Sequence, residues 1–279
     1  MNNRKYAAKA LLNIAVFIVV LVEIYPLVLM VFGSFKTAAE LSGNPSGIPM
    51  EPTLDNYARL FSYSGGLIVR CLSNSIFIAV VCTGLTLLIS AMAAYAFAKC
   101  PFRGKKTLFM MLLVTMMVPV ELTIPPLYIV FSKIGWLNSY SVQIFPFVAN
   151  VFALFMIRQF MMSIPDALVE AAKIDGASHT RIFFSIMLPV SAPVLSALGI
   201  LVFLNRWNEF LWPTIMISKS KFAPIMQVLP TLNDTGVSMN VPWELMLTGC
   251  SIVTIPVVIV FYVFQDKFLS SATLGAVKG

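Results

Sequence analysis

The sequence predicts an all-α polytopic membrane protein with six transmembrane helices and both termini in the cytoplasm. The first observation is composition: of 279 residues, 59% are apolar and 11% are charged, and the mean hydropathy is +0.88. Soluble globular chains carry about 25% charged residues, so this chain could not cover a surface that faces water. The other two observations are a set of long apolar stretches and an uneven distribution of lysine and arginine between them.

The apolar stretches are the expected transmembrane helices. A helix needs about 20 mainly apolar residues to cross a bilayer, and it satisfies its own backbone hydrogen bonds there. The first stretch follows Arg4, Lys5 and Lys9 as in a signal peptide. However, it is longer than the apolar part of a cleaved signal, which has about 7–15 residues, so we expect it to be retained. The expected spans are residues 10–32, 73–98, 107–131, 140–160, 189–213 and 246–264.

Lysine and arginine predict the orientation of these spans. Twelve of the 19 basic residues fall on the side of the membrane that holds both termini, and the other seven fall on the opposite side. The side richer in basic residues is expected to be cytoplasmic. The net charge of +7 is scattered between apolar spans and is not gathered in one patch. The expected partner is therefore the lipid bilayer and not nucleic acid.

The cysteines and the single histidine indicate neither a disulfide framework nor a metal site. Cys71, Cys82, Cys100 and Cys250 show no pair spacing, and two of them lie inside apolar stretches. We expect them to pack as small apolar side chains. His179 stands alone in the sequence, and one histidine does not make a metal site.

The inner segment between the fourth and fifth spans predicts a helix–turn–helix elbow at about 163–187. Ser163, followed by Pro165 and Asp166, is a helix-start pattern. Gly176 supplies a stop, because glycine readily takes the left-handed conformation that ends a helix. A second short helix at about 178–187 then leads into the fifth span. A capped elbow is by itself most often only a connection.

The residue pattern of this elbow resembles the coupling-helix motif of ABC-importer permeases. The matching residues are Glu170, Ala171 and Ala172, then Asp175, Gly176 and Ala177, then Ile186, Leu188 and Pro189. The resemblance extends along nearly the whole chain and is closest to the carbohydrate branch, in particular to the smaller permease subunit of the maltose transporter. It rests on the sequences at 54–57, 74–75, 94–99, 102–105, 117–119, 124–128, 207–213 and 275–279.

The resemblance implies a type I ABC-importer permease fold in a bacterial or archaeal cell membrane. Such a permease has no catalytic residue of its own and forms half of a translocation pore for a carbohydrate. Its implied partners are a second, homologous permease in a heterodimer, a cytoplasmic ATPase dimer and an extracytoplasmic solute-binding protein. ATP and Mg²⁺ are bound by the ATPase and not by this kind of chain.

The resemblance also divides the chain into three parts. Residues 1–70 correspond to the N-terminal helix and first external loop, 71–265 to the permease core and 266–279 to a cytoplasmic tail. The family ending usually has a Thr-Ala-Gly run where residues 271–274 here read Ser-Ala-Thr-Leu. The tail residues expected to reach the ATPase are Gly275, Val277, Lys278 and Gly279.

Two further groups of residues are candidates for solute transfer. In the outer segment 214–245, Lys219, Lys221, Asn233, Asp234 and Asn240 are the candidates to face the binding protein, although for each single residue a solvated polar loop is the favoured explanation. Pro119 and Glu121 in the third span, and Asn208 and Glu209 near the outer end of the fifth, are expected to line the pore. The proline positions are also compatible with a simple kink, and Glu209 with an ion pair to Arg206.

Two alternative functions fit parts of the sequence. A gradient-driven secondary transporter predicts several acidic residues deep in the spans and inverted repeats. Only Glu23 and Glu121 lie deep in the expected spans, and there is no clear repeat. Permeases for amino acids, peptides or metals share the elbow motif, but they generally lack the Trp-Asn-Glu-Phe-Leu-Trp-Pro sequence at 207–213. The sequence therefore favours a carbohydrate importer.

Overall fold

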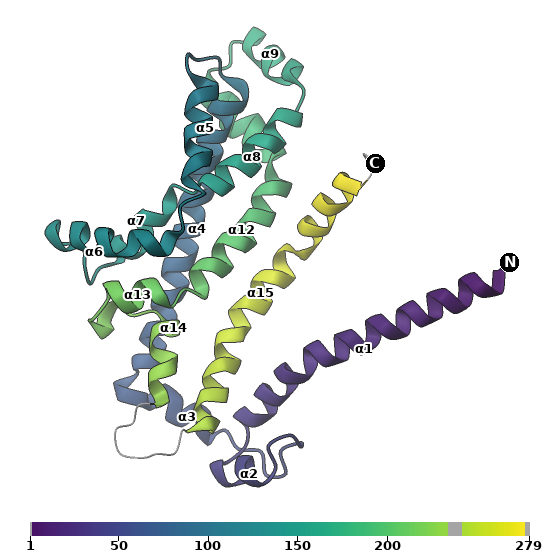
Figure 1. Cartoon of the computed structure of the whole chain (residues 1–279), viewed down its shortest axis with the longest axis vertical. Helices are drawn as coiled ribbons and strands as arrows, with labels where there is room; N and C mark the ends of the chain where they lie inside the picture. The colour runs from purple at the N-terminus through teal and green to yellow at the C-terminus, as the bar shows by residue number, and fades with distance from the viewer. Residues whose placement is uncertain (1, 234–241, 277–279) are drawn as a thin grey trace. The chain divides into compact units, whose positions relative to one another are not determined.

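The structure is a computed structural model that describes the backbone of residues 2–233 and 242–276, and the side chains of residue 6, 9–232 and 242–264. Every regular element in these residues is helical (Figure 1), as the sequence predicts. The elements are α1 (Asn2–Ser34), α2 (Ala38–Gly43), α3 (Asp55–Ser62), η1 (Tyr63–Gly65), α4 (Leu67–Lys99), α5 (Lys105–Thr115), η2 (Val120–Thr123), α6 (Ile124–Lys133), α7 (Tyr140–Val148), α8 (Val151–Ser163), α9 (Asp166–Ile174), α10 (His179–Ile182), η3 (Phe183–Met187), α11 (Leu188–Val190), α12 (Ala192–Trp207), α13 (Leu211–Met216), η4 (Ser220–Phe222), α14 (Ile225–Val228), η5 (Leu229–Asn233) and α15 (Trp243–Ala276).

Length and composition single out four helices that could each cross a membrane. They are Lys9–Ser34, Leu67–Lys99, Tyr140–Ser163 and Trp243–Phe264, and they correspond to the first, second, fourth and sixth expected spans. Two further helix pairs pass the same test only if each bent pair is counted as one span. The described residues therefore hold four candidate spans, or up to six.

The third and fifth expected spans, at 107–131 and 189–213, are both sharply bent; the prolines of the third span already indicated an interruption there, whereas the bend of the fifth was not expected. The third span bends by 94° between α5 and the segment that begins at η2, and the fifth bends by 76° between α11 and α12. Proline explains both breaks, since it lacks the amide hydrogen that continues a helix. Pro119 directly precedes η2, and Pro193 lies in the first turn of α12.

The chain forms two compact units. Unit 1 contains Met1–Val69 and Val228–Pro256, and unit 2 contains Arg70–Gln227 and Val257–Gly279. Unit 2 holds the predicted elbow.

Unit 1 is organised around a lysine and an asparagine that are both buried. The Lys36 ammonium donates to the carbonyl oxygens of Asn44 at 2.7 Å and Gly47 at 2.6 Å. The Asn56 side-chain amide on α3 donates to the carbonyl oxygens of Ser34 at 3.0 Å and Lys36 at 2.8 Å. Buried polar groups are tolerated when they are hydrogen-bonded in this way. These bonds fix the loop after α1 against α3.

Unit 2 packs α4, α5, α8 and α12 along one another, with α9 at one end (Figure 1). The main core cluster joins α4, α8, the elbow and α12 through fully buried side chains such as Ala94, Ile157, Ile182 and Met187. A second cluster sets Phe97 of α4 against Phe109 of α5. The elbow is thus part of the core of unit 2 and not an appended loop.

The buried lysine of unit 1 gives a testable prediction. Replacing Lys36 by Met leaves the Asn44 and Gly47 carbonyl groups without their donor, and an unpaired buried polar group costs about 1–3 kcal/mol. We expect the backbone amides between residues 37 and 53 to exchange hydrogen about tenfold faster or more, as measured by mass spectrometry. The matched control is Lys133→Met, because Lys133 is an exposed lysine at the end of α6. Equal exchange in the two variants would contradict the role of Lys36.

Candidate functional site

The elbow consists of α9, a tight turn and α10, followed by the wide π-helical turn η3. Helix α9 begins after Pro165 without a side-chain cap. This corrects the predicted role of Ser163, which instead ends α8 and donates to the carbonyl oxygen of Phe160 at 2.8 Å. The predicted stop at Gly176 is confirmed: its φ is +76°, and its amide donates to the carbonyl oxygen of Lys173 at 3.0 Å. The second helix occupies the expected residues, as α10 and η3.

A buried lysine at the end of α4 holds the start of α9. The Lys99 side chain is 4% exposed, and its ammonium donates to the carbonyl oxygen of Ile164 at 2.6 Å and to Asp166 Oδ1 at 2.5 Å. The hydrogen bond and the charge of Lys99 lower the pKa of the Asp166 carboxyl below its ordinary value of 3.8. This interaction is therefore fully present above pH 3.8 and is lost as the pH falls through the lowered pKa. It holds throughout the physiological range.

A second contact joins α4 to α10. The Tyr95 hydroxyl lies 3.0 Å from Nδ1 of His179, and the Tyr95 ring lies 5.7 Å from that of Phe183. Ser178 caps α10 by accepting a hydrogen bond from the amide of Arg181. The histidine therefore positions the elbow, and both of its helices are fixed to α4.

Apolar side chains complete this attachment. Val169 and Ala172 on the inner face of α9 are buried, and both belong to the core cluster that includes Met161 of α8 and Met187 of η3. On the outer face of α9, Glu170 and Ala171 are exposed, and Ile174 is 87% exposed. One face of α9 is thus bound to the unit 2 core and the other faces outward.

A groove of about 200 Å³ lies between α9 and the segment formed by α10 and η3. It brings together four of the predicted coupling residues with three that the sequence did not single out. Small side chains form one part of its lining and a carboxylate and a guanidinium form another, so the groove can accept the backbone and charged groups of a partner protein. The predicted residues are Ala172, Asp175, Ala177 and Ile186, and the additional ones are Arg181, Ile182 and Ser185.

The remaining coupling residues lie around this groove. Glu170, Ala171 and Gly176 are exposed on α9 and its turn. Leu188 packs against the core cluster, and Pro189 is exposed in α11, where the fifth span bends. Lys99 and Tyr95 were not among the predicted site residues. A lysine at the last position of an apolar span was the available sequence signal, although it reads equally well as a topology charge.

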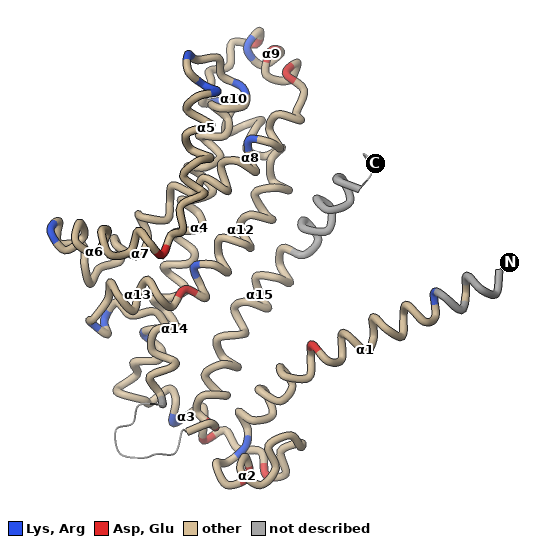
Figure 2. The backbone as a smooth tube through the Cα atoms, viewed as in Figure 1, with Lys and Arg blue, Asp and Glu red and all other residues tan. Residues whose placement is uncertain are grey.

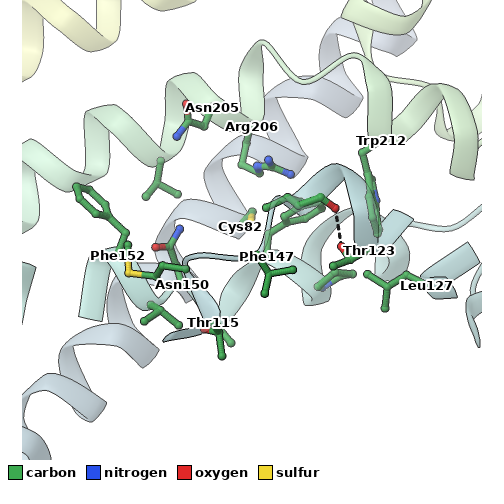
Figure 3. A pocket seen from close by; sticks show the side chains of 17 residues that line it. Cys82, Thr115, Thr123, Leu127, Phe147, Asn150, Phe152, Asn205, Arg206 and Trp212 are labelled. Carbon is green, nitrogen blue, oxygen red and sulfur yellow. Dashed lines mark hydrogen bonds between the residues drawn. The ribbon is translucent and has the colours of Figure 1, made fainter. Parts of the chain in front are cut away.

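The predicted pore residues lie near a second and larger cavity of about 470 Å³ in unit 2 (Figure 3). Pro119 and Glu121 alternate with two of its lining residues, Val118 and Val120, but do not themselves line it. Asn208 is exposed outside the lining. Glu209 makes the ion pair with Arg206, at 3.0 Å, and its other oxygen accepts a hydrogen bond from the amide of Trp212.

The other predicted residues are only partly described. Lys219 and Lys221 are exposed at η4, and the amide of Lys219 donates to Asn138 Oδ1 at 2.8 Å. Asp234 and Asn240 lie outside the described residues, as do Val277, Lys278 and Gly279. Asn233 and Gly275 lie in helical segments whose side chains are not described. Within the described residues, no three His, Cys, Asp or Glu side chains gather as metal ligands would.

Comparison with known proteins identifies relatives along almost the whole chain. Residues 86–272, which include the elbow, match the family of binding-protein-dependent transport system inner membrane components. The arabinooligosaccharides transport system permease protein AraQ of Halalkalibacterium halodurans is 35% identical over 272 residues, covering 96% of both chains. The trehalose/maltose transport system permease protein MalG of Thermococcus litoralis is 32% identical over 275 residues, covering 97% of both.

A solved structure has the same fold. One chain of a bacterial ABC transporter involved in the import of the acidic polysaccharide alginate superposes with a TM-score of 0.86. The match covers 96% of this chain and 99% of that one at 21% sequence identity, so it speaks for the fold alone.

The lysine contact at α9 gives a second prediction. Replacing Lys99 by Met leaves the buried Ile164 carbonyl group unpaired, at a cost of about 1–3 kcal/mol, so the amides of α9 should exchange about tenfold faster or more. Asp166→Asn should have a smaller effect, because the Asp166 side chain is 76% exposed and the carbonyl contact survives. Lys106→Met, at an exposed lysine of α5, is the control. The role of Lys99 is refuted if Lys99→Met exchanges like this control.

Proposed function

This chain belongs to the family of binding-protein-dependent transport system inner membrane components, and we propose that it is the permease subunit that couples carbohydrate import to ATP hydrolysis. The observation that carries this proposal is the outward-facing α9 with its groove, at the positions of the coupling motif. The chain itself is not catalytic. ATP and Mg²⁺ bind to a partner ATPase, and this subunit receives the motion that nucleotide binding produces.

The geometry of the elbow suits such a coupling role. A force applied to the exposed face of α9 passes to α4 through the hydrogen bonds of Lys99 and to α8 through the buried Val169 and Ala172. Because protein interiors are close-packed, these contacts move together rather than yielding separately. The groove beside α9 offers Asp175 and Arg181 for charge pairing with the ATPase.

In the proposed topology the chain crosses the membrane six times, with each bent pair counted as one span. Lysine and arginine gather around α9, α10 and the start of α5, at one end of unit 2 (Figure 2). The rule that basic residues remain in the cytoplasm places this end, and both termini, inside the cell. The groove is then on the side of the membrane where ATP is available.

The proposed assembly contains one further permease, an ATPase dimer and an extracytoplasmic binding protein. The permease partner forms the other half of the pathway, and the tail residues 275–279 extend toward the ATPases. The outer segment with Lys219 and Lys221 faces the binding protein. A solved alginate transporter in complex with a periplasmic protein, which has a TM-score of 0.62 to this chain, supports such an arrangement. The assembly resides in a bacterial or archaeal cell membrane.

The substrate class is a carbohydrate. The relatives are named for arabinooligosaccharides, for trehalose and maltose, and, in Rhizobium radiobacter, for lactose. These are neutral sugars, but another relative, of Agrobacterium fabrum, is named for sulfoquinovosyl glycerol, which carries a sulfonate, and the structural relative belongs to a transporter of an acidic polysaccharide.

The uptake of labelled mono-, di- and oligosaccharides by cells that lack this chain tests the proposed function. We expect ATP-dependent uptake of one class of saccharide to disappear in these cells and to return when the wild-type chain is supplied. Unchanged uptake of every saccharide would overturn the carbohydrate assignment. Uptake that follows an ion gradient and persists without ATP would point instead to a secondary transporter.

The turn after α9 gives a test of coupling. Gly176 has a φ of +76°, and a β-carbon there would meet no atom within 4 Å, so a side chain is penalised by the backbone conformation and not by a clash. A left-handed conformation costs an ordinary residue about 1–2 kcal/mol, and asparagine adopts it more readily. We expect Gly176→Val to reduce saccharide uptake and retention of the ATPase during purification. Gly176→Asn should retain most of both, and equal loss in the two variants would contradict this account.

A further inference from the structure

The larger cavity of unit 2 forms where three segments are interrupted. Helix α5 ends at Thr115, the α7–α8 segment is broken at Ala149 and Asn150, and α12 ends just after Asn205 and Arg206. In a membrane, an interrupted helix is tolerated only where protein or a water-filled cavity satisfies the freed backbone groups. The volume of about 470 Å³ falls within the range of about 300–1,000 Å³ that is usual for small-molecule sites.

Aromatic rings line this cavity from two sides (Figure 3). Trp212 is buried, donates through Nε1 to the carbonyl oxygen of Val142 at 2.9 Å and meets the Phe147 ring edge to face at 5.0 Å. Phe152 lies across the cavity from them, is 45% exposed and makes no ring contact within the described residues. The negative face of an aromatic ring attracts polarised C–H groups, which are abundant on the apolar face of a sugar ring.

Polar groups around the aromatic rings can form hydrogen bonds with the hydroxyl groups of a sugar. The side-chain amide of Asn205 makes no hydrogen bond within the described part of the chain and is exposed to the cavity. The Asn150 amide oxygen caps α8 by accepting from the amide of Ala153, which leaves its NH₂ group available. The Thr115 hydroxyl donates to the carbonyl oxygen of Leu112, and its oxygen can accept. Donors and acceptors are thus both present, as a hydroxyl ligand requires.

The charge of the lining is compensated. Among the described residues that line the cavity, Arg206 alone is charged, and its side chain is 13% exposed. Its guanidinium carbon lies 3.6 Å from the centre of the Phe147 ring, and Glu209 pairs with it from outside the lining. The guanidinium of Arg206 is therefore held in place as a hydrogen-bond donor in the cavity, and its positive charge is balanced by the carboxylate of Glu209. An anion would have to compete with Glu209 for the guanidinium.

We infer that this cavity binds one uncharged sugar ring of the transported saccharide, and that the Arg206–Glu209 pair selects neutral sugars over acidic ones. The inference rests on the proposed function, which supplies the saccharide. Phe152 stacks on the ring, Asn205 and Asn150 bond its hydroxyl groups, and Glu209 is a positioning residue that neutralises Arg206 without touching the sugar.

The experiment measures equilibrium binding of two labelled trisaccharides to the purified permease–ATPase complex in lipid nanodiscs, without the binding protein. One is the neutral trisaccharide that cells import, and the other is its uronic-acid analogue. Phe152→Ala should weaken binding of the neutral trisaccharide by about tenfold. Phe261→Ala should not, since Phe261 is another exposed phenylalanine, on α15, and does not line the cavity.

Glu209→Gln tests the selectivity. Glutamine keeps an oxygen for the amide of Trp212 but leaves the Arg206 charge uncompensated. We expect the affinity for the uronic-acid trisaccharide, relative to the neutral one, to rise by about tenfold or more. An unchanged ratio, equal effects of Phe152→Ala and Phe261→Ala, or no binding to a complex that imports the neutral sugar would each overturn this inference and leave the proposed function intact. Absence of all saccharide import by cells would instead refute the proposed function.

Discussion

The hydrogen bonds of Lys99 are the constraint on which the coupling end of this protein depends. A buried ammonium is costly unless it is paired and hydrogen-bonded, and Lys99 obtains its partners from the Ile164 carbonyl and from Asp166. The end of α4 and the start of α9 must therefore lie together. Once they do, Val169 and Ala172 enter the core, and the opposite face of α9 is left free for a partner.

Helix α8 links the two functional regions of unit 2. Its N-cap residue, Asn150, lines the large cavity, and the helix ends at Ser163, next to the elbow. Its 13 residues correspond to about 20 Å of helix. Both ends are fixed, by the Asn150 cap at one end and by Ile157 and Met161 in the core cluster toward the other. In the proposed coupling mechanism, this helix would carry a movement of the groove to the cavity as one rigid element.

The breaks in the helices have the same effect as the buried ammonium of Lys99. Each leaves polar groups without a hydrogen-bond partner in their own helix, so neighbouring segments must supply the partners. Proline interrupts the third span, and residues on both sides of that break, Thr115 and Val120 among them, line the large cavity. The Arg206–Glu209 pair then fixes the last turn of α12 to the start of α13, because Glu209 also accepts from the amide of Trp212. The polar groups of the cavity are held in place by this connection.

The sequence by itself determined the helical class, the positions of the apolar segments and the elbow with its stop at Gly176. These properties follow from composition, local periodicity and backbone preference, all of which act over a few neighbouring residues. Only the tertiary structure decided how sharply the third span bends, that the fifth span is bent as well, that Lys99 holds α9 and that the cavity is lined by Asn205 and Arg206 rather than by Asn208. Such features depend on contacts between segments distant in sequence: Lys99 and Asp166 are 67 positions apart, and no local pattern specifies which carbonyl group a buried ammonium will find.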